Sequence, residues 1–75
     1  MEYEDLTERE IIVLKLLAKG IKNSDIANEL NVTIHTIKAH LESIYPKLRV
    51  NSRLQAVLRG MIIGIIDEKD IFGKE

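Results

Sequence analysis

The chain has 75 residues, a formal net charge of −1 at pH 7 and no cysteine. A chain this short makes one small domain, and the missing cysteines exclude a disulfide framework, a thiolate metal site and a cysteine nucleophile. Charged residues interrupt the apolar runs, so we expect no membrane-spanning helix, no signal peptide and a cytoplasmic location. The sequence contains no nucleophile–base pair, metal-ligand cluster or glycine-rich phosphate loop, so we expect neither an enzyme nor a bound cofactor, metal or small-molecule ligand.

The charges are unevenly distributed along the chain. Residues 1–10 hold five acidic side chains and one basic side chain, and residues 67–75 hold four acidic and two basic ones. Residues 11–66 therefore hold three acidic and eight basic side chains, a net charge of +5. This central part could meet a polyanion, although a solvated surface between two acidic ends explains the same pattern.

The first predicted helix begins after Thr7. Thr7 and Glu10 have the spacing of a capping box, in which each side chain bonds the other residue's backbone N–H. Gly20 suits the left-handed position that ends such a helix. The apolar residues that would face the core are Ile12, Val13, Leu14, Leu16 and Leu17.

The second and third predicted helices are joined by a short turn. Asn23 is the expected cap of the second helix, and Asn31 tolerates the left-handed conformation that ends it. Thr33 caps the third helix. Ala27 is small where the two helices would cross closely, so the pair is predicted to form a helix-turn-helix. The inward stripe of the third helix comprises Ile34, Ile37, Leu41, Ile44 and Leu48.

Two residues disturb the end of the third helix. Proline removes a backbone donor and clashes with the preceding turn, so we expect Pro46 to end or bend the helix near Ile44. A left-handed Arg49 after the helix would cost on the order of 1 kcal/mol, so the chain could use another turn there.

The fourth predicted helix, capped by Ser52, has more apolar residues than one buried face requires. Ile71 and Phe72, in the acidic tail at residues 67–75, could fold back and cover the additional apolar residues of this helix. If they do not, the tail is expected to fray. The alternative is a homodimer contact. The residues assigned to the core are Leu54, Val57, Leu58, Met61, Ile62 and Ile65. The residues assigned to the dimer contact are Ala56, Arg59, Ile63 and Ile66.

Several ordered motifs at fixed spacing resemble one family. They are "LTERE", the Gly20 turn, "NSDIANEL", "VTIHTIKAH", "KLRV" and "SRLQA". Together they resemble the LuxR/FixJ-type, or GerE-like, DNA-binding domain over residues 6–58. The resemblance implies an all-α four-helix bundle, with the third helix in the major groove of DNA and the fourth helix as the usual dimer contact.

The resemblance also implies the domain organisation and the partners. We expect a single domain over residues 1–75, with a core at residues 6–66 and the acidic tail at residues 67–75. Family members occur alone or as output domains of response regulators, and a stand-alone protein is the expectation here. The expected partners are double-stranded DNA, a second copy of the chain and RNA polymerase.

Within the third helix, Lys38 is the first candidate for DNA contact, either to a phosphate or to the O6 and N7 atoms of guanine. Ala39 would let the helix approach the bases and could touch a thymine methyl group. His35 could donate to phosphate, and so could the hydroxyl groups of Thr33 and Thr36, although Thr33 is also a cap.

Glu42 is the awkward member of this set. It could accept a hydrogen bond from cytosine, or it could simply pair with Lys38 one turn away. His40 is expected to be packed and bonded to backbone. Glu10 is expected to cap its own helix or, by resemblance, to pair with a cation such as Lys47 or Arg53. The residues expected to flank the DNA are Lys22, Asn23, Lys47 and Arg53.

Two functions from different classes remain open for this sequence. The first, which is the leading hypothesis, is a sequence-specific transcription regulator that binds DNA. The second is a helix-turn-helix that binds another regulator or polymerase, which the low overall charge and Glu42 favour modestly.

Overall fold

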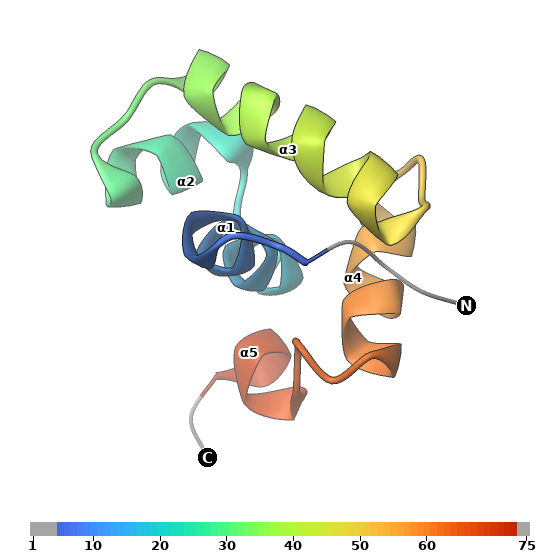
Figure 1. Ribbon diagram of the computed structural model, residues 1–75. Helices are drawn as coiled ribbons and strands as arrows, with labels where there is room; N and C mark the ends of the chain where they lie inside the picture. The colour runs from blue at the N-terminus through green and yellow to red at the C-terminus, as the bar shows by residue number, and fades with distance from the viewer. Residues whose placement is uncertain (1–4, 74–75) are drawn as a thin grey trace.

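The computed structural model describes residues 5–73, and these form five α-helices and no strand (Figure 1). The predicted all-α fold with a helix-turn-helix is confirmed, and one short helix is added at the C-terminal end. The helices are α1 (Glu8–Ala18), α2 (Asn23–Leu30), α3 (Ile34–Leu48), α4 (Arg53–Ile62) and α5 (Glu68–Phe72).

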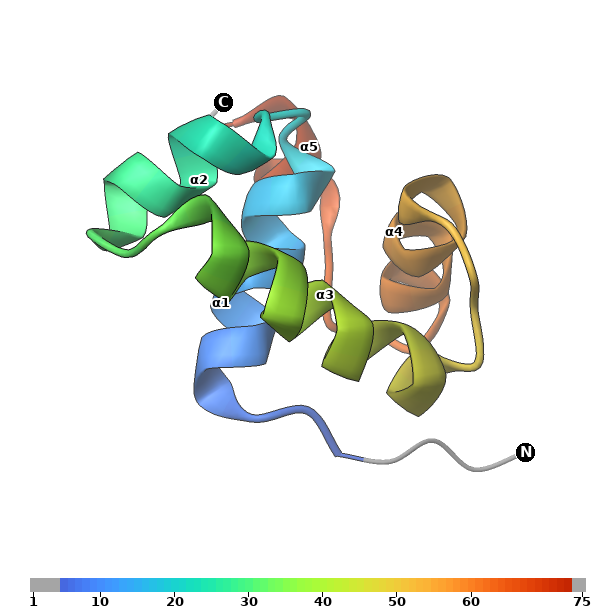
Figure 2. The same cartoon turned by 90° about the horizontal axis from the view of Figure 1, so that it is seen from above.

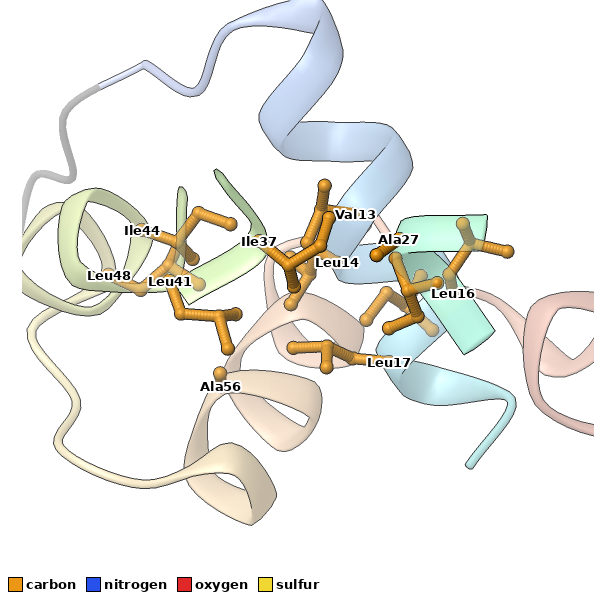
Figure 3. Close-up of a cluster of buried hydrophobic side chains, with 12 residues drawn as sticks. Val13, Leu14, Leu16, Leu17, Ala27, Ile37, Leu41, Ile44, Leu48 and Ala56 are labelled. Carbon is orange, nitrogen blue, oxygen red and sulfur yellow. The ribbon is translucent and has the colours of Figure 1, made fainter. Parts of the chain in front are cut away.

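Helix α1 is the centre of the arrangement and packs against all four other helices. Helices α2 and α3 lie on one side of α1, and α5 lies on the opposite side (Figure 1). Seen from above, α3 crosses over α1, and α4 lies beside them (Figure 2). The core between these helices is apolar (Figure 3). Its buried apolar side chains are Val13, Leu14, Leu16, Leu17, Ile26, Ala27, Ile37, Leu41, Ile44, Leu48, Ala56 and Ile66.

Side-chain caps set the start of three helices where the sequence predicts them. The Thr7 hydroxyl accepts from the Glu10 N–H at 3.1 Å, and the Glu10 carboxylate accepts from the Thr7 N–H at 2.9 Å. Thr33 and Ser52 cap α3 and α4 in the same way. The prediction for α2 was wrong, because its N-cap is Lys22, whose side chain makes no capping bond.

The ends of α2 and α3 use the same left-handed turn. Asn31 has φ of 60° and Arg49 has φ of 59°. After α3, the Val50 N–H donates to the Tyr45 carbonyl at 3.0 Å and the Arg49 N–H donates to the Pro46 carbonyl at 3.1 Å, which is a Schellman motif. Arg49 therefore adopts the left-handed conformation despite its side chain, and the alternative turn allowed by the sequence is not used.

Pro46 does not end α3, which corrects one of the two alternatives expected from the sequence, an end or a bend near Ile44. The helix continues through Pro46 to Leu48. The carbonyl left without a donor belongs to Glu42, and both Glu42 and Pro46 are exposed, so water can reach that side of the helix. Ile44 and Leu48, on either side of Pro46, are fully buried and hold both halves of this stretch against the core.

Most of the residues on and just after α4 lie on the opposite side from the one predicted, although Val57 and Ile65 pack against the core as expected. Ala56 and Ile66, assigned to a dimer contact, are 0% and 3% exposed, whereas Leu54 and Ile62, assigned to the core, are 67% and 78% exposed. The reason is a close approach of α4 to the core at Gly60. A Cβ atom there would lie 2.7 Å from Ile66 Cδ1 and 3.3 Å from Leu14 Cδ2. Small residues therefore face inward. Leu58 and Met61 are also exposed, while Val57, Arg59, Ile63 and Ile65 are half-buried.

Two smaller expectations about the core were also wrong. Ile12 in α1 and Ile34 at the start of α3 are exposed, although both were assigned to inward faces. Ile34 is the first residue of α3, where no preceding turn of the helix covers it.

The stretch expected to fray forms α5. Asp67 caps it, and Asp70 completes a second capping box with the Asp67 N–H. Helix α5 packs against α1 and, within the described residues, makes no contact with α4. Ile71 joins the core, and Phe72 stays exposed. The tail therefore folds back, but it leaves the outer face of α4 uncovered.

Candidate nucleic-acid interface

Helix α3 presents one continuous exposed face to solvent, which we call the outer face of α3. Successive residues of an α-helix are about 100° apart, so these exposed positions fall within an arc of about 100°. The buried residues of the same helix point into the core on its other side. The outer face comprises His35, Lys38, Ala39, Glu42 and Pro46.

The start of α3 carries two hydroxyl groups close together. Thr33 Oγ1 lies 3.2 Å from Thr36 Oγ1 and also accepts from the Thr36 N–H at 3.2 Å. Thr33 is exposed and Thr36 is half-buried. The Thr33 hydroxyl therefore caps α3 and also remains accessible to an anion.

The charged groups on the outer face are not bonded to each other. Among the described residues, neither Lys38 nor Glu42 forms an ion pair or a side-chain hydrogen bond. The pair expected between them one turn apart is therefore not formed. His40 lies beside this face and is half-buried, but its imidazole has no hydrogen bond within the described residues, so the predicted bond to backbone is absent too.

Glu10 connects α1 to the second half of α3. Its carboxylate is buried and accepts from the Lys47 ammonium at 2.8 Å and from the Ser43 hydroxyl at 2.7 Å, in addition to its capping bond. The two roles left open by the sequence are both filled, with Lys47 as the cation. Ser43 was missed, although its spacing of four residues from Lys47 places both side chains on one face of the helix.

These bonds decide the charge of Glu10. Burial by itself would raise the pKa of this carboxyl group. The hydrogen bonds from Lys47, Ser43 and Thr7, together with the positive charge of Lys47, outweigh burial and lower the pKa from 4.5 to about 2. Glu10 is therefore an ionised link that sets the position of α3 on α1.

Arg53 holds the start of α4 against the loop before α2. Its guanidinium donates to the Asn23 side-chain oxygen at 2.9 Å and also to the Ile21 carbonyl. Asn23, Lys47 and Arg53, all predicted to flank DNA, thus have partners inside the protein. Lys22 is exposed at the N-cap of α2 and has none among the described residues.

Helix α4 carries a second exposed feature, which we call the outer face of α4. Its four large apolar side chains recur at steps of four, three and one residues, so they share one side of the helix. They are Leu54, Leu58, Met61 and Ile62. No helix of the described part of the chain is long and apolar enough to cross a membrane.

Comparison with known proteins gives the same family in sequence and in structure. Residues 4–59 match the family described as GerE, bacterial regulatory proteins of the luxR family. The chain is 52% identical over 61 residues to the transcriptional regulatory protein YdfI of Bacillus subtilis, covering 81% of this chain and 29% of YdfI. It is 50% identical over 56 residues to the response regulator VraR of Staphylococcus aureus, covering 75% of this chain and 27% of VraR. The chain thus spans less than a third of these relatives.

Two solved structures share the fold. The response regulator ChrA of a heme-sensing two-component system superposes with a TM-score of 0.81 at 33% identity, covering 88% of this chain and 33% of ChrA. The transcription factor GerE superposes with a TM-score of 0.78 at 29% identity, covering 85% of this chain and 97% of GerE. The resemblance in the sequence motifs is confirmed. The chain belongs to the luxR family of bacterial regulatory proteins and is a helix-turn-helix domain of transcriptional regulators.

Proposed function

We propose that this domain binds double-stranded DNA in a sequence-specific way, with α3 in the major groove. The observation that carries the proposal is the outer face of α3, which is exposed along the helix, while the opposite side packs in the core and is bonded to Glu10. An α-helix fits the width of the major groove, and its exposed side chains then meet the base edges.

The residues on and beside this face divide into two groups. Thr33, His35 and Thr36 lie at the start of α3, and Lys22 lies at the N-cap of α2; backbone N–H groups at the start of a helix also favour a phosphate. Lys38 and Ala39 lie one turn further along and would meet base edges. Phosphate contacts position a protein on DNA, and base contacts specify the sequence.

Asn23, Lys47 and Arg53 have a different part in this proposal. Each is engaged within the protein, so DNA contact would have to compete with bonds that hold α3 and α4 in place. We therefore assign them mainly to positioning the helices. Arg49 is exposed at the end of α3 and is a better candidate for an added phosphate contact.

We also propose that the domain forms a homodimer through the outer face of α4. Four large apolar side chains on one side of a ten-residue helix are costly to leave in water, and α5 does not cover them. A two-fold dimer would place two copies of α3 about one turn of DNA apart, on an inverted repeat.

Titration of labelled duplexes at several salt concentrations tests the DNA-binding proposal. Replacing Lys38 by Ala should weaken binding, and if Lys38 meets a phosphate the salt dependence should fall by about one ion. Lys69→Ala removes an exposed lysine from α5 and is the matched control. If the unmodified protein shows no salt-sensitive binding to any duplex, the proposal fails and a protein-interaction module becomes the better account.

Sedimentation tests the dimer proposal. The Leu58→Glu variant places a charge in the middle of the outer face of α4 and should be monomeric and still helical. Ile12→Glu makes the same change at an exposed apolar residue of α1 and should leave the dimer intact. A monomeric unmodified protein at high micromolar concentration contradicts the proposal, and so does a Leu58→Glu variant that remains a dimer.

A further inference from the structure

Glu42 is the only acidic residue of α3 and lies near the middle of the outer face of that helix. About 100° of rotation per residue places it between Lys38 on one side and Ala39 on the other. It is exposed and, among the described residues, its side chain has no ion pair or hydrogen bond. Its carboxylate oxygens are therefore unoccupied acceptors on the face that would meet the bases.

No neighbour of Glu42 donates to these oxygens in the structure; Lys38, one turn earlier on the same face, forms no bond with them and is assigned to the DNA. Ser43 is adjacent, but its hydroxyl is committed to Glu10 at 2.7 Å. Pro46, one turn further along, offers no donor, and Ala39, on the preceding turn, is too short to reach. When Lys38 contacts the DNA, a carboxylate placed in the groove here must find its hydrogen bond on the DNA or lose the one it made with water.

The chemistry of base edges selects the partner. In the major groove, guanine presents two acceptors and thymine presents an acceptor and a methyl group, so neither donates to a carboxylate. Adenine presents a donor beside the N7 acceptor, which a carboxylate would repel. Cytosine presents its N4 amino group, and this is the base edge that glutamate accepts from.

We propose that Glu42 is a specificity-determining residue that accepts a hydrogen bond from the N4 amino group of one cytosine in each half-site. This inference rests on the proposed function, because it requires α3 to lie in the major groove. Glu42 also repels phosphates, so it weakens binding wherever the cytosine is missing. Glu42 therefore lowers the affinity of the domain for duplexes in general and increases its discrimination between sequences.

Selection of bound duplexes from a random pool, at a fixed salt concentration, tests this role in three forms of the domain. The unmodified protein should prefer cytosine at one position of the half-site by at least about fivefold. Glu42→Gln has the same shape and can bond adenine through N6 and N7, so the preference at that position should move to adenine. Glu42→Ala should show no preference there beyond about twofold and should bind random duplexes more tightly.

Glu68→Gln is the control, since it removes the same charge from an exposed position of α5, a helix that does not contact α3. It should select the same sequences as the unmodified protein. If the Gln and Ala variants at position 42 also select those sequences, Glu42 has no role in specificity while the DNA-binding proposal stands. If the unmodified protein itself binds no duplex in a salt-sensitive way, both proposals fall together.

Discussion

Replacing Glu10 by Gln should remove the largest single electrostatic contribution to the fold that the described residues reveal. The substitution keeps the shape of the side chain and still allows its oxygen to accept the capping bond from Thr7. It removes the charge that Lys47 faces at 2.8 Å, and it leaves that ammonium half-buried without a counter-ion. Leaving one partner of such a pair unmatched is more damaging than removing both.

The size of the effect follows from the lowered pKa of Glu10. A carboxyl group with a pKa of 4.5 in the unfolded chain and about 2 in the folded protein stabilises the fold fully above pH 4.5. That stability is lost as the pH falls through about 2. The difference between the two values corresponds to about 3 kcal/mol at neutral pH, of which about 2 kcal/mol is lost by pH 3. A 75-residue domain has only about 4–11 kcal/mol in total.

Urea unfolding followed by circular dichroism measures this directly. Glu10→Gln should lower the free energy of unfolding by about 3 kcal/mol at pH 7 and by about 1 kcal/mol at pH 3. Glu8→Gln, in the same turn but exposed, should cost less than about 1 kcal/mol at either pH. If the free energy of unfolding of Glu10→Gln changes between pH 5 and pH 3 as much as that of the unmodified protein, the ion pair only offsets its own desolvation. The expected contribution of Glu10 to stability would then be refuted.

Three further predictions use the same unfolding measurement. Pro46→Ala should raise the free energy of unfolding, by up to about 3 kcal/mol, because the donor to the Glu42 carbonyl returns; a loss of stability would contradict this. Arg49→Gly should raise it by about 1 kcal/mol, since glycine adopts φ of 59° without strain, and an unchanged value would count against that. Ala56→Leu should lower the free energy of unfolding by about 1–3 kcal/mol, because Ala56 is fully buried. Ile62→Ala should change it by no more than about 0.5 kcal/mol in dilute protein, because Ile62 is exposed. The opposite order of effects would mean that Ile62 is buried and Ala56 exposed, as the sequence predicted.

The parts of the fold that could be predicted are those decided by local chemistry. Thr7, Thr33 and Ser52 each satisfy a backbone N–H three residues later, which the sequence reveals without any tertiary structure. The exposed position of Lys38 follows in the same way, because the periodicity of α3 fixes which side is buried. The N-cap of α2 was predicted wrongly. Asn23 is a residue type that often caps helices, but its side chain is bonded to Arg53, thirty residues away.

The parts that could not be predicted depend on contacts between distant residues. The cost of Pro46 in a helix is local, but burial of Ile44 and Leu48 around it is tertiary and outweighs that cost. The Ser43 bond to Glu10 joins residues 33 positions apart, and the only local sign of it is the four-residue spacing between Ser43 and Lys47. The periodicity of α3 therefore predicts which side of the helix is exposed, and the family resemblance suggests the pairing of Glu10 with Lys47, but the sequence did not lead to the Ser43 bond that completes this network.

Helix α4 was misjudged for a reason that bears on its function. Large apolar residues are usually buried, so a helix with apolar residues on two sides was assumed to turn its larger side chains inward. The close approach at Gly60 requires the opposite, and Ala56 fills the inner face. Because Leu58 and Ile62 then contribute little to the folding of one copy, substitutions on this outer face separate assembly from stability. A loss of dimers in Leu58→Glu with unchanged unfolding would therefore assign those side chains to a contact between copies.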